Sequence, residues 1–196
     1  MRKLIQQRIE ESIFVTKSLL IDDNIINTIV QLAIVLSKII SSGGRVFLCG
    51  NGGSASDALH ISGELVGRFQ EERSAWSAIT LNSDVVAMTS IANDYGYENI
   101  FARQVEAHIR KDDLLIGFST SGNSENICKA VEMAKKLNGS TAAFIGNKGG
   151  KLGKMVDFSI VVPSDITARI QESHILIGHI LCELVEGCLN EKSNIP

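Results

Sequence analysis

Four side chains in two distant segments of the sequence could hold a metal ion or move protons. His60 and Glu64 lie four residues apart, which places both on one face of a helix. Gln171 and His179 belong to a second helical segment, where they are about 80° apart around the axis. Imidazole and carboxylate groups suit a divalent ion such as zinc, although Gln is an unusual ligand, and His with Glu also suits proton transfer beside a carbonyl. Spacing alone leaves both chemistries open, together with a plain surface pair.

A cluster of hydroxyl groups is typical of a phosphate site. Ser119, Thr120, Ser121 and Ser124 follow an apolar run in the segment "STSGNS". Together with the backbone amides around Gly122, they can donate several hydrogen bonds to a phosphate. Ser124 alone could be explained as the N-cap of the next helix. Four hydroxyl groups within six residues favour the phosphate site over that simpler interpretation.

The segment "GNGGSA" upstream could turn a strand into a helix or bind a ligand. Gly50, Gly52 and Ala55 fit the G-x-G-x-x-G/A pattern of dinucleotide-binding domains. That type of domain also requires an acidic residue shortly after the second strand, and no acidic residue stands there at the right distance. No Gly-Lys-Ser/Thr follows, so a Walker-type loop is excluded. A phosphosugar site and a turn without a ligand remain as alternatives.

The composition indicates a globular protein. Of 196 residues, 44% are hydrophobic and 21% are charged, and the net charge is −3. An acidic balance argues against a general nucleic-acid binder. No signal peptide is visible, and the apolar stretch "IVQLAIVLSKII" contains Gln and Lys and is short for a membrane span. We therefore expect a cytoplasmic protein that binds neither membranes nor nucleic acid.

The four cysteines predict structural thiols. Cys49, Cys128, Cys182 and Cys188 form no CxxC pair and lie in apolar or helical contexts. Such residues are usually buried free thiols in a reducing compartment.

The elements that must position these residues alternate in type after the first 44 residues. Two amphipathic helices are expected at 2–20 and 23–41, ended by "SSGG". Continuous apolar strands then alternate with helix-length segments, which predicts a parallel sheet covered on both faces. The expected strands are 45–49, 77–80, 114–118, 141–145 and 158–162, and the expected helices are 54–67, 84–94, 98–109, 125–137, a short one near 150–155, and 165–190. The fold class is therefore α/β, a three-layer sandwich with a five-stranded parallel sheet and an N-terminal helical extension.

The last expected helix also indicates self-association. Its sequence "ARIQESHILIGHILCELVEGCL" is apolar around most of its circumference. Such a helix is buried on several sides, either inside the domain or at a subunit interface. We expect a homo-oligomer.

Four segments together resemble the phosphoheptose isomerase family. They are "CGNGGSASDALHISGELVGRF", "SIANDYGYENIFARQVEA", "LLIGFSTSGNSENICKA" and "VPSDITARIQESHILIGHILCELVE". The resemblance covers nearly the whole chain and keeps the order and spacing of the family. It implies the sugar isomerase (SIS) fold, which is flavodoxin-like, and a homotetramer with active sites between subunits. It also implies a single SIS domain over residues 1–196, with N-terminal helices at 1–43 and the α/β core and last helix at 44–196.

The resemblance implies the following site residues. Glu64 and His179 match the catalytic positions of the family, and its zinc ligands, one ion per subunit, fall on His60, Glu64, Gln171 and His179. The substrate-binding positions fall on Asn51, Gly52, Gly53, Ser54, Glu64, Arg68, Asn93, Asp94, Ser119, Thr120, Ser121, Ser124 and Gln171. Ser54 and Arg68 are matched less closely than the others. Ala168 departs from the pattern, because some family members carry an acidic residue there.

The activity implied is an aldose–ketose isomerisation of a sugar phosphate. The family converts sedoheptulose 7-phosphate to D-glycero-D-manno-heptose 7-phosphate through an enediol, as the first step of bacterial ADP-heptose or GDP-heptose biosynthesis. The alternative is a non-catalytic SIS protein that binds a replication initiator or senses a sugar phosphate. The initiator-binding protein lacks the acid–base residues, whereas this chain retains His60, Glu64 and His179, which favours the enzyme.

Overall fold

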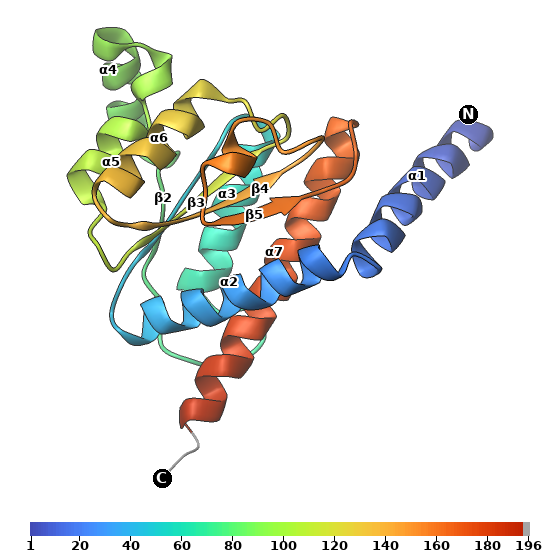
Figure 1. The fold of residues 1–196 in the computed structure, drawn as a ribbon, viewed down its shortest axis with the longest axis horizontal. Coiled ribbons are helices and arrows are strands. Elements are labelled where there is room, and N and C mark those ends of the chain that lie inside the picture. The colour runs from blue at the N-terminus through green and yellow to red at the C-terminus, as the bar shows by residue number, and fades with distance from the viewer. Residues whose placement is uncertain (194–196) are drawn as a thin grey trace.

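A computed structural model describes residues 1–193 as a sheet of five parallel strands between two layers of helices (Figure 1). The strand order is β2-β1-β3-β4-β5, the flavodoxin-like order in which the chain changes direction between β1 and β3. Ligands bind at such a switch point, beyond the carboxyl ends of the strands. The strands are β1 (Val46–Gly50), β2 (Ala78–Thr80), β3 (Leu114–Ser119), β4 (Ser140–Ile145) and β5 (Phe158–Val161). The expected fold class is confirmed.

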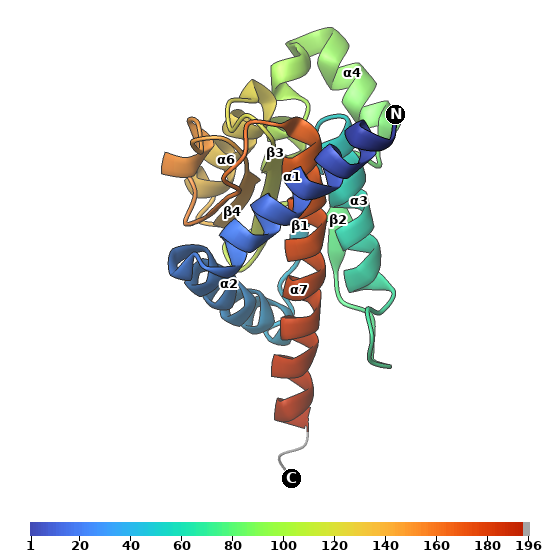
Figure 2. The same cartoon turned by 90° about the vertical axis from the view of Figure 1, so that its right-hand side faces the viewer.

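Helices precede, connect and follow the strands. They are α1 (Arg2–Leu20), α2 (Asp23–Ser41), α3 (Gly53–Val66), α4 (Val85–Tyr95), the 3₁₀ helix η1 (Tyr97–Asn99), α5 (Ala102–His108), α6 (Glu125–Lys136), the 3₁₀ helix η2 (Leu152–Lys154) and α7 (Thr167–Ser193). Figure 2 shows α7 running from below α4 to the lower end of the molecule, with α3 beside it. The site therefore depends on how these two helices pack.

Alternate residues of each strand face opposite helical layers. Val46 and Leu48 of β1 belong to a core cluster with α2, α3 and α7, whereas Phe47 and Cys49 belong to a second cluster with α5 and α6. All four are fully buried. Strands buried on both faces need continuous apolar sequence, which is why "VFLC" shows no polar alternation.

The segment expected as one helix at 98–109 is divided in two. A 3₁₀ turn covers Tyr97–Asn99, and α5 begins at Ala102. Between them Ile100 and Phe101 are fully buried. Gly96, with φ of 87°, sets the direction of the chain into this turn. The short helix expected near 150–155 is likewise one 3₁₀ turn at Leu152–Lys154.

Helix α2 is long and apolar enough, by length and composition alone, to cross a membrane. In this fold 39% of its apolar window is buried inside the protein. The buried residues Ile25, Ile29, Leu32 and Leu36 join the core cluster that contains α7. Its apolar character is therefore also that of a core helix.

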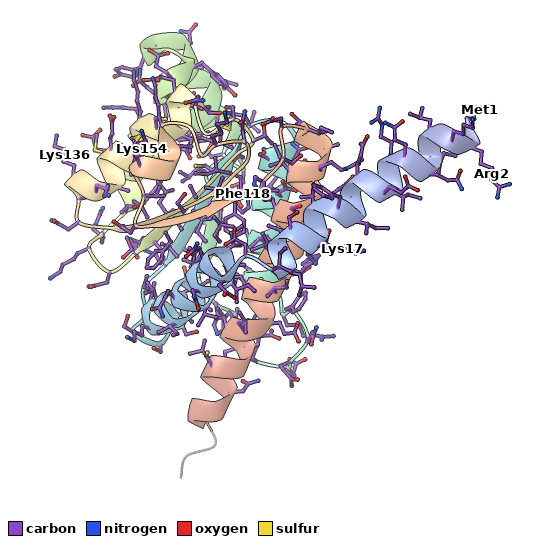
Figure 3. The ribbon with its side chains drawn as sticks, turned by 45° about the vertical axis from the view of Figure 1, so that its right-hand side comes forward. Met1, Arg2, Lys17, Phe118, Lys136 and Lys154 are labelled. Carbon is purple, nitrogen blue, oxygen red and sulfur yellow. The ribbon has the colours of Figure 1, made fainter. Side chains whose placement is uncertain are left out.

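Helix α1 extends away from the body of the molecule. Only Val15 and Leu19 are buried among its described residues. In Figure 3 Met1 and Arg2 lie at the far end of this helix, whereas Phe118 lies inside the fold. A helix of this length gains little stability by itself in water, so its exposed apolar residues call for a partner surface.

Candidate active site

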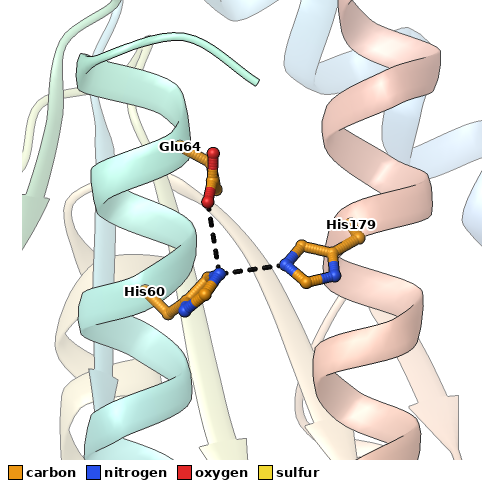
Figure 4. Close-up of side chains that lie close together, drawn as sticks. All are labelled: His60, Glu64 and His179. Atoms are coloured by element: carbon orange, nitrogen blue, oxygen red, sulfur yellow. Dashed lines mark hydrogen bonds and ion pairs between the residues drawn. The ribbon is translucent and has the colours of Figure 1, made fainter. Parts of the chain in front are cut away.

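His60, Glu64 and His179 lie together between α3 and α7 (Figure 4). His60 Nε2 is 3.2 Å from Glu64 Oε1 and 3.0 Å from His179 Nε2. The side chain of His60 is 48% exposed and that of Glu64 is 26% exposed, so the cluster is open to a ligand. The helical spacing of four explains the first contact, and helix packing supplies the second.

A small residue lets α3 and α7 approach each other at this point. Gly178 immediately precedes His179, and a Cβ added there would collide with the Ile61 side chain of α3. Ile61 and Ile177 are themselves buried in the same core cluster. Close contact between the two helices therefore brings His179 within hydrogen-bond distance of His60.

The three side chains fit a divalent metal ion. Their nearest ligand atoms all lie within 4.8 Å of one another. Zn–N bonds of about 2.0–2.1 Å in a tetrahedron put neighbouring ligand atoms about 3.3–3.4 Å apart, close to the two distances above. Two imidazoles and one carboxylate leave the fourth position of a tetrahedron for another ligand.

The side chain of Gln171, on α7, packs against Gly53 at the start of α3. A Cβ added at Gly53 would collide with the side-chain amide of Gln171 in its present position. Gly52 has φ of 56°, which strains any residue with a side chain. The "GNGG" segment, which follows β1, thus packs against the N-terminal part of α7. Ser54, the next residue, is 3% exposed.

The hydroxyl-rich loop after β3 forms its own hydrogen-bond network. Ser119 Oγ and Ser124 Oγ lie 2.9 Å apart, and the Gly122 N–H donates to Ser119 Oγ. Ser124 stands at the N-cap position of α6, but its side chain makes no capping hydrogen bond. The capping explanation of this serine is therefore wrong as far as its hydroxyl is concerned. Ser121 Oγ accepts from the Asn123 N–H. Thr120 lies between Ser119 and Ser121 in the sequence.

Asn51 links the turn after β1 to this loop. Its side-chain amide exchanges two hydrogen bonds with that of Asn126 on α6, at 2.9 and 2.8 Å. The Tyr97 hydroxyl also donates to Asn51 Oδ1 at 3.0 Å. Sequence reasoning missed Asn126 and Tyr97, because neither belongs to a recognisable spacing.

Three expected substrate residues stand apart from this cluster. Asn93 and Asp94 are exposed on α4, where the Asn93 amide donates to Asp94 Oδ1. Helix α4 buries none of its described residues. Arg68 follows α3 and faces its own loop, 3.6 Å from Glu72. Within this chain these side chains therefore contact neighbours in sequence rather than His60, Glu64 or His179.

Two further acidic side chains on α3 and α7 were not expected. Asp57 is on α3, one turn before His60, and burial raises its pKa to about 6 although the nearby His60 opposes this. Its Oδ2 is buried without a hydrogen-bond partner among the residues that the structure describes. Glu186 is 2% exposed on α7. The i, i+3 spacing to His60 could have indicated Asp57, but no sequence signal indicates Glu186.

His174 is a core residue, as its apolar neighbours suggest. It is fully buried and makes edge contacts with the rings of Phe118 and Phe144. Burial lowers its pKa to about 4, so it is neutral at neutral pH.

Comparison with known proteins identifies the family. The SIS domain profile matches residues 20–146, which is more than half of the chain. The chain belongs to the SIS domain family. It is 55% identical over 152 residues to the phosphoheptose isomerase of Helicobacter pylori, covering 78% of this chain and 79% of that one. It is 48% identical over 187 residues to that of Thermodesulfovibrio yellowstonii, covering 95% and 92%.

A solved structure shows the same arrangement. The phosphoheptose isomerase from Francisella tularensis superposes with a TM-score of 0.90 at 38% identity, covering 94% of this chain and 97% of that one. The expected resemblance is thereby confirmed, and this SIS protein is an isomerase. The non-catalytic alternative is accordingly set aside.

Proposed function

We propose that this SIS isomerase interconverts sedoheptulose 7-phosphate and D-glycero-D-manno-heptose 7-phosphate. The observation that carries the proposal is the juxtaposition of Glu64 and His179, which places a carboxylate and an imidazole together between α3 and α7. The names of the relatives support the seven-carbon substrate. Such a conversion would be the first step of ADP-heptose or GDP-heptose biosynthesis.

We assign substrate binding to the two loops at the carboxyl edge of the sheet. Ser119, Thr120, Ser121 and Ser124 would hold the phosphate by their hydroxyl groups. The sugar hydroxyls would meet the turn from Asn51 to Ser54 and the amide of Gln171. Asn93, Asp94 and Arg68 would complete the pocket on ligand binding or from a neighbouring subunit, because within this chain they stand apart.

In the proposed reaction two proton transfers balance each other. The Glu64 carboxylate removes the proton from C1 of the open-chain ketose, and His179 gives a proton to O2, which produces the enediol. Glu64 then returns its proton to C2 while His179 takes the proton from O1, which leaves the aldose and restores both side chains. Each such acid or base typically contributes about 10²–10⁴-fold in rate.

We propose zinc, one ion per subunit, on His60, Glu64, Gln171 and His179. When bound, the ion would polarise the sugar oxygens that gain and lose protons. One carboxylate can both ligate and accept a proton, because its two oxygens can serve different partners. Two imidazoles and one carboxylate lie close enough together to share one ion, and the amide oxygen of Gln171 would be the fourth protein ligand.

We propose a homotetramer with active sites between subunits. Helices α1, α2 and α7 border an apolar groove of about 350 Å³, whose lining includes Leu20, Ile26 and Leu184. Exposed Ile180 also lines this groove and follows His179 directly, so a second copy seated there would lie next to the site. We further propose that residues 1–196 act as one functional domain, because α1 and α2 border this groove together with α7. We also propose that the protein acts in the cytoplasm.

The experiment that tests this proposal is direct. The purified protein is incubated with sedoheptulose 7-phosphate, with and without a chelator, and the aldose product is followed over time. We expect product that is lost with chelator and restored by Zn²⁺, from a species with the mass of four chains. Absence of the aldose in every condition would overturn the reaction, and retention of activity after complete metal removal would overturn the metal.

A further inference from the structure

The carboxylate of Glu186 is buried on α7 and is saturated by donors from one loop. It accepts hydrogen bonds from three successive backbone N–H groups, those of Phe69, Gln70 and Glu71, at 3.0, 2.9 and 3.0 Å. The Arg73 Nε donates to it at 2.9 Å. The segment that follows α3 is therefore wrapped around one charge on α7.

Arg73 connects the same charge to the end of α3. Its Nη2 donates to the backbone carbonyl of Glu64 at 2.9 Å, and its Nη1 donates to that of Leu65 at 3.0 Å. The guanidinium also lies 3.4 Å from the centre of the Trp76 ring. With Arg73 6% exposed and Glu186 2% exposed, the pair is buried, and it holds the last turn of the helix that carries Glu64.

Phe69 brings this network to the acid–base cluster. Its ring stacks on the imidazole of His179, with centroids 5.5 Å apart and planes 22° apart. On its other side His179 meets His60 at 3.0 Å. The His179 ring is thus confined between a proposed metal ligand and an aromatic face that Glu186 holds by the Phe69 backbone.

A buried ion pair rarely stabilises a fold more than apolar residues of similar volume would. Charges removed from water cost several kcal/mol each, and an apolar replacement is often neutral or stabilising. Here every donor to Glu186 comes from the single loop between Gly67 and Arg73, and each contact fixes where that loop passes His179. This arrangement is better explained as a way to hold the loop in place beside His179 than as a source of stability.

We propose that Glu186 is a positioning residue for the reaction proposed above. Its carboxylate fixes the loop from Gly67 to Arg73, and this loop holds the His179 ring through Phe69 and the end of α3 through Arg73. The role extends the proposed function, because it concerns the orientation of the same His179 and Glu64. Groups behind metal ligands that act in this way typically change metal affinity or activity by about 10–100-fold.

The test compares three variants of the full-length protein. Glu186→Gln keeps the size of the side chain but turns an amide N–H₂ toward backbone donors. Phe69→Leu removes only the ring that stacks on His179. Glu183→Gln is the matched control, since Glu183 is exposed on the same helix.

Each variant is measured for Zn²⁺ affinity by competition with a chromophoric chelator, for kcat and KM with sedoheptulose 7-phosphate, and for thermal midpoint. For Glu186→Gln and Phe69→Leu we expect about 10-fold weaker Zn²⁺ binding and a kcat lowered about 10-fold or more, with KM within about 3-fold. Glu183→Gln should match the parent protein in all three measurements.

The outcomes separate positioning from simple stabilisation. A folded Glu186→Gln protein with a lower thermal midpoint but parental Zn²⁺ affinity and kcat would overturn the proposal. If that variant does not fold, Phe69→Leu decides, and parental values there would overturn it equally. If the parent binds Zn²⁺ but does not isomerise the sugar, the proposed function fails while the affinity comparison still decides the role of Glu186. A parent that does neither overturns both.

Discussion

The two halves of the candidate site are constructed in different ways. The loop half, from Ser119 to Ser124 with Asn51, is held by hydrogen bonds among residues at the ends of β1 and β3. The helix half brings His60 against His179, which is 119 residues away in sequence. Its geometry depends on the packing of two helices and on a buried ion pair behind them.

Because the two halves are held in place differently, changes in them should affect different kinetic constants. A loop that follows a buried strand inherits its position from the sheet, so single changes there should alter affinity and little else. Helices that meet through side chains can shift by fractions of an ångström when packing changes. We therefore expect the helix half to control kcat and the loop half to control KM.

The largest effect should come from the proposed base. Glu64→Gln keeps the shape of the side chain but removes its basicity, so kcat should fall by about 10³-fold or more. Circular dichroism and thermal midpoint should remain close to parental, because the side chain is partly exposed. Exposed Glu132 on α6 provides the control, and Glu132→Gln should retain full turnover. Near-normal turnover of the Glu64 variant would refute its role.

The next effect should fall on the loop half. Ser124→Ala removes a hydroxyl proposed to bind phosphate, and loss of a hydrogen bond to a charged group corresponds to about 10–100-fold in KM. Stability should change little, because this hydroxyl does not cap α6 and its partner, Ser119 Oγ, keeps the hydrogen bond from the Gly122 N–H. Asp22 does cap α2 through the N–H groups of Asn24 and Ile25, so Asp22→Ala should cost about 1 kcal/mol of stability with KM unchanged. A parental KM for Ser124→Ala with a raised KM for Asp22→Ala would contradict the expectation that the loop half controls KM.

A third change tests the helix contact directly. Gly178→Ala places a methyl group against Ile61, which should separate α3 from α7, cost about 1–3 kcal/mol and lower kcat about 10-fold. A Cβ at Gly187, on the same helix, meets nothing within 4 Å, so Gly187→Ala should instead stabilise the protein by about 0.5–1 kcal/mol. Denaturant unfolding and steady-state kinetics of the pair measure both expectations. If the two variants behave alike, close helix approach is not what places His179.

The halves also differ in how far sequence could predict them. The strand boundaries and the hydroxyl cluster were predictable, because apolar runs and polar loop residues are local patterns. The meeting of His60 with His179 came only from the family resemblance, since spacing within each helix says nothing of their relative position. Glu186 was missed entirely, because its three main donors are backbone groups that carry no side-chain signature. The division of 98–109 depends similarly on the burial of Ile100 and Phe101, which is a tertiary effect.

Two buried side chains of α7, His174 and Glu186, should lose their contributions to stability at different pH values. His174 packs against Phe118 of β3, and burial lowers its pKa to about 4. Between this value and the ordinary histidine pKa of about 6.5, the unfolded chain binds a proton here and the folded chain does not. Stability from this residue is complete above pH 6.5 and falls by about 1.4 kcal/mol at pH 5.5. For Glu186 burial raises the pKa, but the N–H groups of Gln70, Phe69 and Glu71 outweigh it and lower the pKa overall, so its contribution is lost only below about pH 4.5.

Urea unfolding of His174→Leu and the parent at pH 7.5 and 5.5 measures the first of these windows. We expect the parent to lose about 1.4 kcal/mol more stability than the variant between the two pH values, because only the parent carries a histidine that titrates on unfolding there. Glu186→Gln should show the parental loss over this range, since its carboxylate stays ionised in both states. If the free energy of unfolding falls equally in the parent and in His174→Leu, the acid sensitivity comes from other residues and not from protonation of His174.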